Sequence, residues 1–221
     1  MDRESATHSG FGRPELLGDD MTPASLCTLA AEAYNDPPTF SVAGDVHCTV
    51  TPQVDGAVVA AFRGTVLTNA LDWLRDFDDF PDASQIGTCF RGFLTGAQQA
   101  LPNLRGLGRP LILTGHSLGG ALAIAAAAFL VQEGRAPLFC TTFGAPRVSL
   151  DGELTKILAS VPGYRYRCGD DPIPLVPWAG RPDRDVTRIG RATLDPIADH
   201  MIAAYARAII GIDTAPQTPR S

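Results

Sequence analysis

The sequence lacks the features that mark several large classes of protein. It has no cluster of Lys or Arg, and its formal net charge is −6. Since a nucleic-acid-binding protein needs a basic surface to meet phosphate groups, we expect no nucleic acid among its partners. Residues 1–21 contain no apolar run of the kind found in a Sec signal peptide. The longest apolar run, residues 118–131, is interrupted by glycine and is too short to span a bilayer. We expect a soluble protein, either cytoplasmic or exported by another route.

No two cysteines stand in the C-x-x-C spacing that marks zinc fingers and thioredoxin-like redox sites. The five cysteines lie far apart in apolar segments, at Cys27, Cys48, Cys89, Cys140 and Cys168. An odd number of scattered cysteines favours buried free thiols over a disulfide framework, although one or two bridges would be compatible with an oxidising compartment.

The chain has the length and composition of one globular domain. Its 221 residues are 45% hydrophobic and 19% charged, with no internal repeat or low-complexity block. Residues 1–21 are polar and aperiodic, which predicts a mobile arm, and residues 213–221 form a tail. We expect a single domain at 22–212.

Apolar runs and helical patterns alternate along this domain. Thr22 and Pro23 are typical of a helix start, and an Asp55-Gly56 turn joins two short runs into an antiparallel hairpin. The runs that predict strands are 45–51, 57–62, 110–115, 137–144, 164–168 and 185–189. The segments that predict helices are 22–34, a helix starting near 90, 118–132 and 198–210. This order predicts an α/β fold with a mostly parallel sheet, an antiparallel N-terminal edge and helices on both faces.

One sequence motif indicates a candidate catalytic residue. The stretch GHSLG at residues 115–119 fits G-x-S-x-G, and it lies between a predicted strand and a predicted helix. That context is typical of a nucleophile elbow, in which the serine of a tight turn exposes its hydroxyl above the sheet. Gly115 and Gly119 would let the strand and the helix pass close together. We interpret Ser117 as a catalytic nucleophile.

A serine hydroxyl needs a base to take its proton, and in hydrolases with this elbow the acid and the histidine follow the serine. His200 is the only histidine downstream of Ser117, because the others are His8, His47 and His116. Elimination therefore makes His200 the base.

The acid that orients this histidine is predicted at Asp171. It follows a strand and a glycine turn, which puts it at the carboxyl end of the sheet, near the serine. Asp170 is its immediate rival. Asp199 adjoins His200 and would have difficulty reaching its ring. The remaining aspartates interpreted as surface charges are Asp183, Asp185 and Asp195.

Two groups are candidates for an oxyanion hole. The backbone N–H of Leu118 follows the serine at a helix start. Thr65, in the segment AFRGT, ends a predicted strand and could offer its N–H and its hydroxyl, with Gly64 allowing a close turn. The alternative is that Thr65 caps the helix after it.

These segments together resemble the class 3 lipases, an α/β-hydrolase family. The matching blocks stand in the family's order between about residues 49 and 205, and they are AFRGT, DWLRDF, RGF, GHSLGGALA, TFGAPRV, DDPIPLVP and DHMIAAY. The resemblance implies an α/β-hydrolase catalytic domain with Asp171 as the acid and His200 as the base. It also implies hydrolysis of lipid esters with no metal or organic cofactor, and a transient contact with a lipid interface. Acyl length and oligomeric state are left open.

Residues 66–80 follow the candidate oxyanion residue with apolar side chains at helical spacing. By the resemblance this segment is the lid, and its candidate apolar residues are Leu71, Trp73, Leu74 and Phe77. The alternative is a helix packed permanently on the sheet. For the function, the alternatives are a short-chain or aromatic-acid carboxylesterase, an acyltransferase, or a non-catalytic lipid-binding module on the same scaffold.

Overall fold

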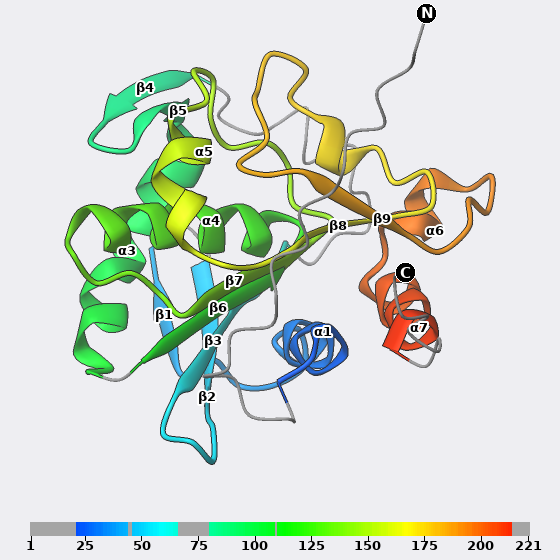
Figure 1. Cartoon of the computed structure of the whole chain (residues 1–221), viewed down its shortest axis with the longest axis horizontal. Helices are drawn as coiled ribbons and strands as arrows, with labels where there is room; N and C mark the ends of the chain where they lie inside the picture. Colours follow the sequence, from blue (N-terminus) through cyan, green and yellow to red (C-terminus); the bar gives the residue numbers. More distant parts are fainter. Residues whose placement is uncertain (1–20, 44–45, 66–79, 109, 214–221) are drawn as a thin grey trace, which may run out of the picture.

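The computed structural model describes residues 21–43, 46–65, 80–108 and 110–213 (Figure 1). The candidate lid residues Leu71, Trp73, Leu74 and Phe77 lie outside these ranges, so the lid stays a prediction. Met21, at the end of the predicted arm, is buried against the core.

The described strands of the main sheet run in the order β1-β2-β3-β6-β7-β8-β9. Strands β1 to β3 pair antiparallel, and β3, β6, β7, β8 and β9 pair parallel. Their bounds are Phe40–Val42 (β1), Val46–Pro52 (β2), Val58–Phe62 (β3), Leu111–His116 (β6), Phe139–Phe143 (β7), Arg165–Cys168 (β8) and Val186–Ile189 (β9). The α/β fold with a mostly parallel sheet and an antiparallel N-terminal edge is therefore confirmed.

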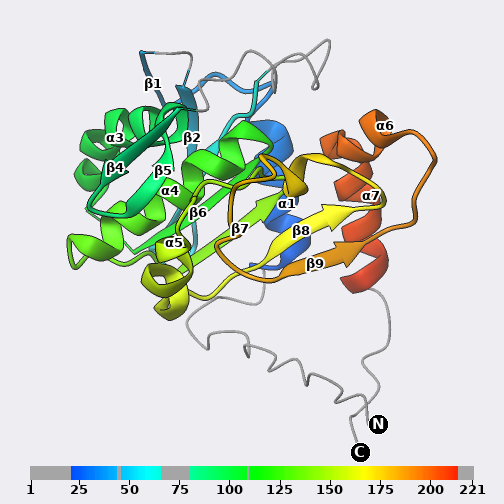
Figure 2. The same cartoon turned by 90° about the horizontal axis from the view of Figure 1, so that it is seen from above.

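Helices cover both faces of this sheet, as the alternating pattern predicts (Figures 1 and 2). On one face lie α1 (Pro23–Glu32) and α7 (Ile202–Asp213), and on the other lie α3 (Arg91–Gly106), α4 (Leu118–Gln132) and α5 (Glu153–Ile157). The shorter turns of helix are η1 (Leu158–Ser160), η2 (Ile173–Leu175) and α6 (Pro196–His200). Helix α1 begins as the sequence predicts, because Thr22 and Ser25 form a reciprocal capping box and Pro23 occupies the first turn.

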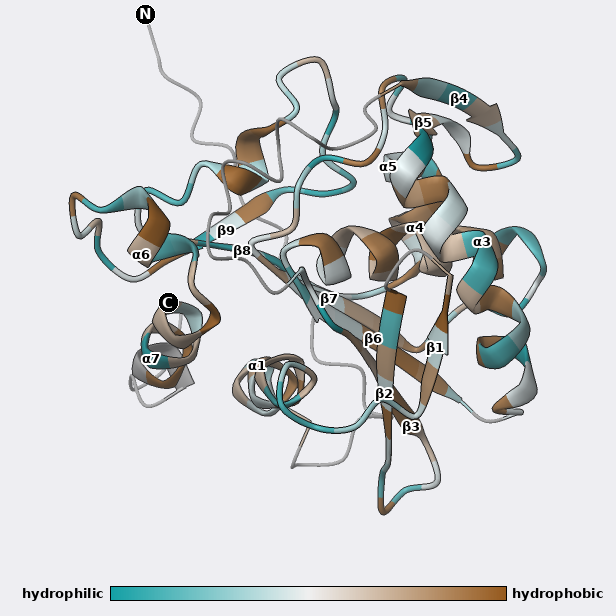
Figure 3. Ribbon diagram, turned by 180° about the vertical axis from the view of Figure 1, so that it is seen from behind, coloured by the Kyte–Doolittle hydropathy of each residue, from teal (hydrophilic) through white to brown (hydrophobic). Residues whose placement is uncertain are grey.

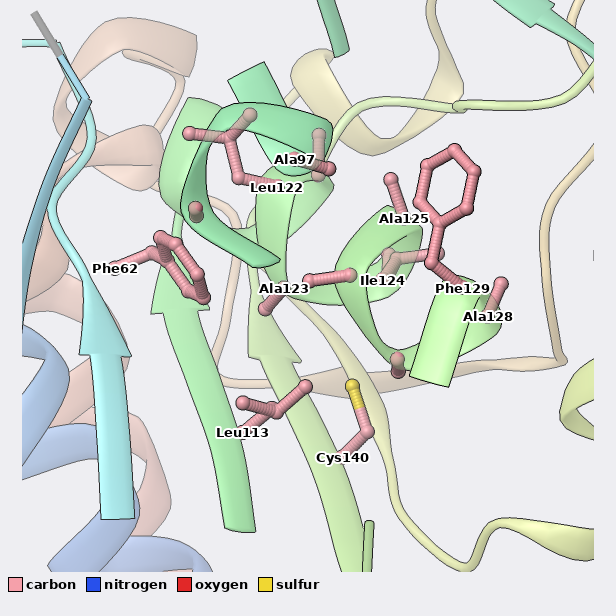
Figure 4. Close-up of a cluster of buried hydrophobic side chains, with 14 of the residues drawn as sticks. Phe62, Ala97, Leu113, Leu122, Ala123, Ile124, Ala125, Ala128, Phe129 and Cys140 are labelled. Atoms are coloured by element: carbon pink, nitrogen blue, oxygen red, sulfur yellow. The ribbon is translucent and has the colours of Figure 1, made fainter. Parts of the chain in front are cut away.

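The core has two parts, one on each face of the sheet. The larger centres on α4, whose residues from Gly119 to Leu130 are all buried (Figure 4). Hydrophobic residues run along α4 and the adjoining strands, whereas α3 mixes hydrophobic and hydrophilic residues (Figure 3). The smaller part packs α1 and α7 on the opposite face. Burial on both faces explains why the central strands read as continuous apolar runs. No helix in the described ranges is long and apolar enough to cross a membrane.

Several details differ from the sequence-based expectation. Strand β1 and a hairpin of β4 (Pro81–Ser84) and β5 (Gly87–Phe90) were not predicted. They are short and carry weak β signals, and pairing with neighbours stabilises them. The helix predicted at 198–210 is interrupted at Met201, whose backbone is extended with φ −63° and ψ 137°. His200 therefore ends a short helix and does not begin a long one.

Asp183 is not the surface charge that the sequence predicted. It is buried, and its carboxylate accepts a hydrogen bond of 3.0 Å from Nη1 of the fully buried Arg165. The same guanidinium donates to backbone oxygens of Ala145 and Pro174, so this ion pair ties together the loops after β7 and β8. All five cysteines lie in the described residues, where they are buried and unpaired, as predicted.

Candidate active site

The carboxyl ends of the parallel strands carry the candidate site. In register, Phe62 of β3 lies opposite Gly115 of β6, and His116 of β6 lies opposite Phe143 of β7. The loops that leave β3, β6, β7 and β8 therefore begin side by side, which brings distant segments of the sequence to one edge of the sheet.

Ser117 occupies the tight turn from β6 into α4. Its backbone has φ 56° and ψ −127°, a strained conformation for a residue with a side chain. The flanking glycines make the turn possible by allowing close approach. A Cβ atom on Gly115 would lie 2.5 Å from the backbone of Gly119, and one on Gly119 would lie 2.1 Å from the carbonyl oxygen of Phe62.

The side chain of His200 lies between Ser117 and Asp171. Its Nε2 is 2.9 Å from Ser117 Oγ, and its Nδ1 is 2.8 Å from Asp171 Oδ2. A carboxylate oxygen only accepts hydrogen bonds, so Nδ1 carries the proton and Nε2 is free to accept from the serine hydroxyl. All three residues are buried. The arrangement can withdraw a proton from Ser117 while the carboxylate holds the imidazole in the required tautomer.

Asp171, and not its neighbour Asp170, faces the histidine. Its Oδ1 accepts a hydrogen bond of 2.8 Å from the backbone N–H of Ile173, which fixes the carboxylate at the start of η2. Asp170 turns outward, with its carboxylate 3.5 Å from the exposed guanidinium of Arg188. Gly144, with φ +62°, leaves room for the site, because a Cβ atom there would come within 3.2 Å of Asp171, Tyr205 and His200.

The candidate oxyanion donors lie beside Ser117. Leu118 is the first residue of α4, where a backbone N–H has no partner within the helix and the helix dipole favours negative charge. Gly64 packs against the elbow, since a Cβ atom on it would lie 3.2 Å from Ser117 Cβ. Glycine is needed at position 64 because space is limited there, and not because of the backbone conformation, since the φ of Gly64 is not in the left-handed region. Thr65 follows it, and its buried hydroxyl has no hydrogen-bond partner among the described residues, which is compatible with a candidate donor to a substrate oxygen.

Comparison with known proteins assigns the family. The model of the family "Lipase (class 3)" matches residues 59–180. The chain belongs to the class 3 lipase family. The matched range includes Ser117 and Asp171, whereas His200 lies beyond it, so His200 is a candidate on its geometry alone.

Two relatives that are named as lipases agree with this assignment. The chain is 31% identical over 134 residues to the "Secreted mono- and diacylglycerol lipase 1" of Fusarium solani, a match that covers 54% of this chain and 39% of the relative. It is 33% identical over 171 residues to "Lipase A" of Sodiomyces alcalophilus, covering 58% of this chain and 41% of the relative. The chain thus spans about two fifths of these relatives.

A solved triacylglycerol lipase, described as having a serine protease triad at its catalytic centre, superposes with a TM-score of 0.62 at 19% identity. The superposition covers 76% of this chain and 78% of that one. At this level of identity the likeness establishes the α/β-hydrolase fold.

Sequence reasoning missed Tyr205, which contacts the candidate acid. The residue lies on α7, and its buried hydroxyl donates a hydrogen bond of 2.5 Å to Asp171 Oδ2. Burial and the charge of Asp171 raise the pKa of this phenol well above its usual value, so Tyr205 stays a donor. Its only signal in the sequence is its place in the block DHMIAAY, five residues after the histidine.

Asp199 has a structural role that its position in the sequence did not indicate. The two ring nitrogens of His200 hydrogen-bond to Asp171 and Ser117, and Asp199 has other partners. Its buried carboxylate accepts hydrogen bonds from the backbone N–H groups of Asp170 and Thr193 and from the hydroxyl of Thr193. Burial alone would raise the pKa of Asp199, but these donors hold it below the usual value. Asp199 thus joins the loop of the candidate acid to the segment before α6.

His116 was excluded as the base because it precedes Ser117, yet it is a buried neighbour of His200, with ring centroids 4.8 Å apart. Burial and the neighbouring His200 lower the pKa of His116 well below its usual value, so its ring is neutral.

Within the described residues, no three His, Cys, Asp or Glu side chains are grouped so that they could hold a metal ion.

Proposed function

We propose that this protein is a serine hydrolase that cleaves carboxylic ester bonds of lipids through an acyl-enzyme intermediate. The observation that carries the proposal is the unbroken series of hydrogen bonds from Ser117 through His200 to Asp171, with distances of 2.9 and 2.8 Å. A buried serine, imidazole and carboxylate in this order are the groups that nucleophilic acyl transfer requires.

In the first half-reaction, His200 Nε2 takes the proton of Ser117 as Oγ attacks the carbonyl carbon of the ester. The N–H of Leu118 and the N–H and hydroxyl of Thr65 stabilise the tetrahedral oxyanion. When the intermediate collapses, the bond to the alcohol breaks and His200 returns its proton to the leaving oxygen. Asp171 holds the imidazole and stabilises its charged form throughout.

In the second half-reaction, His200 takes a proton from water as the water oxygen attacks the acyl-enzyme. Collapse of this second intermediate releases the carboxylic acid and restores the serine hydroxyl. Each step uses side chains and backbone groups of this chain, so we propose a reaction that needs no metal or organic cofactor.

A lipid substrate is supported by exposed apolar side chains on the chain segments that carry the candidate acid and base. Apolar side chains are exposed on the segment that leads to and follows the histidine: Leu194 is 93% exposed, Ile197 45% and Met201 51%. Leu194 also has a φ of 65°, a conformation that costs a leucine free energy. Trp178, on the segment that follows η2, is 77% exposed. Apolar side chains displayed in water beside a site favour an apolar partner, and the Fusarium relative is named as a mono- and diacylglycerol lipase.

The chemistry is tested by labelling with a fluorophosphonate, which reacts with an activated serine. We expect stoichiometric labelling of the wild-type protein and none of Ser117→Ala. Labelling that persists in Ser117→Ala would refute the assignment of the nucleophile. A series of p-nitrophenyl esters from acetate to palmitate, followed by diacylglycerol and triacylglycerol emulsions, tests the substrate class. Activity confined to acetate and butyrate would instead favour a short-chain esterase.

The contact with a lipid interface is tested with Leu194→Ser. Loss of one inserted leucine should lower hydrolysis of an emulsion by roughly 10- to 100-fold, because a fully transferred leucine contributes about 1.5–3 kcal/mol. Hydrolysis of dissolved p-nitrophenyl acetate should be unaffected. Val54→Ser is the matched control, since Val54 is fully exposed in the turn between β2 and β3, at the opposite end of the sheet. Equal effects of the two variants on the emulsion would contradict the contact.

A further inference from the structure

His116 has a defined hydrogen-bonding state that follows from its partners. Its Nε2 is 2.7 Å from the backbone carbonyl oxygen of His200, and its Nδ1 is 2.8 Å from the hydroxyl of Tyr34. A carbonyl oxygen can only accept, so Nε2 carries the proton. In a neutral ring Nδ1 is then an acceptor, and the Tyr34 hydroxyl donates to it. Tyr34 therefore selects the tautomer that lets His116 hold the carbonyl of His200.

The hydroxyl of Tyr34 has a second contact, at the end of β3. The backbone of Gly64 packs directly against it, since a Cβ atom on Gly64 would lie only 2.2 Å from the hydroxyl oxygen. Gly64 directly precedes Thr65, the candidate oxyanion donor. One tyrosine hydroxyl, just beyond the end of α1, thus donates to His116 and packs against the residue that precedes Thr65.

The backbone carbonyl that accepts the hydrogen bond from His116 lies at the end of a short helix. His200 is the last residue of α6, and Met201 after it leaves the helix with an extended backbone. The final carbonyls of a helix have no partner within it, and the bond from His116 satisfies this one. His116 is also the neighbour of Ser117 in the chain, so the bond links the backbone of the base to the backbone of the nucleophile.

We propose that Tyr34 and His116 are positioning residues that set the placement of His200 against Ser117 and of the oxyanion strand against both. This inference rests on the proposed function and deepens it, because it names what fixes the reacting groups relative to one another. Neither residue touches the substrate carbonyl. Loss of the Tyr34 hydroxyl frees His116 to adopt the other tautomer, in which Nε2 would face the carbonyl of His200 without a proton.

The test measures kcat and KM of variants per active site, with the active sites counted by fluorophosphonate titration. A displacement of about 1 Å in a reacting group can cost about 100-fold in rate, so we expect Tyr34→Phe to lower kcat about 10-fold and His116→Leu about 100-fold, with KM within about twofold of wild type. His116→Gln can still donate from its amide toward the carbonyl of His200, and it should recover most of the loss seen in His116→Leu.

The matched control is Tyr164→Phe, which removes a hydroxyl from a tyrosine packed against Tyr166 and Phe139, away from these contacts. It should leave kcat at the wild-type value. If Tyr34→Phe and His116→Leu lower the melting temperature but retain wild-type kcat per titrated site, the residues serve stability alone and the inference is overturned. If His116→Leu does not fold, Tyr34→Phe decides by itself. Failure of the proposed function would be seen separately, as labelling of Ser117→Ala.

Discussion

Tyr205 and His200 meet at a single oxygen atom of Asp171. The phenol hydroxyl lies 2.5 Å from Oδ2, and the imidazole Nδ1 lies 2.8 Å from the same atom. The other oxygen of the carboxylate is held by the backbone of Ile173. The carboxylate is therefore fixed by one donor from α7 and one from its own loop while it orients the histidine.

Removal of the Tyr205 hydroxyl should slow the reaction without abolishing it. A hydrogen bond to a charged group contributes about 1.5–3 kcal/mol, so Tyr205→Phe should lower kcat by roughly 10- to 100-fold. Steady-state kinetics on a soluble p-nitrophenyl ester measure this, with Tyr164→Phe as the control for loss of a phenol hydroxyl elsewhere. A kcat within twofold of wild type would show that the hydrogen bond from Tyr205 to Asp171 does not contribute to the rate.

The two neighbouring aspartates should behave very differently. Asp171→Asn removes the charge that stabilises the imidazolium and favours the wrong tautomer, and it should lower kcat by about 1,000- to 10,000-fold. Asp170→Asn changes an exposed pair with Arg188 and should keep kcat within about twofold, as is usual for exposed ion pairs. If Asp170→Asn gave the larger loss, the assignment of the acid would be reversed.

The buried pair of Arg165 and Asp183 should matter for stability. Breaking a buried ion pair by removing one charge costs about 3–5 kcal/mol, because the other charge is left uncompensated. We expect Asp183→Asn to lower the free energy of unfolding by about this amount in urea titrations. Asp185→Asn, two residues away and exposed, should change it by less than about 0.5 kcal/mol. Similar values for the two variants would contradict the role of the pair.

Two glycine substitutions should change stability in opposite directions. In Gly119→Ala the new methyl group would lie 2.1 Å from the carbonyl oxygen of Phe62, so α4 must move away from β3. We expect a loss of about 1–3 kcal/mol or more. Gly106→Ala, at the end of α3, meets nothing within 4 Å and should gain about 0.4–1 kcal/mol. The melting temperature should fall in Gly119→Ala and rise in Gly106→Ala. Equal shifts of the melting temperature in the two variants would contradict this prediction.

His116 should make stability depend on pH. Its pKa is lowered in the folded protein by burial and by His200, so the unfolded chain binds a proton that the folded chain does not. Stability from this group is complete above the unfolded value of about 6.5 and falls as pH decreases below it, by up to about 1.4 kcal/mol per pH unit.

His116→Gln cannot titrate, so its stability should fall less between pH 7 and pH 5. Urea midpoints of the two proteins at both pH values measure the difference. Parallel pH dependence in wild type and His116→Gln would show that His116 binds its proton in the folded state.

The sequence alone determined the class of fold, because its signals are local. Continuous apolar runs identified the central strands, Thr22 and Pro23 marked the start of α1, and glycines on both sides of Ser117 marked the turn into α4. The block order from AFRGT to DHMIAAY then indicated the family. Strands β1, β4 and β5 escaped prediction because their pairing comes from neighbours in space.

The tertiary structure decided which polar side chains meet. Asp170 and Asp171 are adjacent and chemically identical, and only the turn into η2 determines which of them faces His200. Tyr34 lies in no motif, and the block DHMIAAY, which contains Asp199 and Tyr205, does not show what these two side chains contact. Their roles arise because α1, α7 and the acid loop meet at one edge of the sheet. Local patterns record which face of an element is buried, whereas contacts between distant polar groups depend on how the elements pack, and packing is a property of the whole chain.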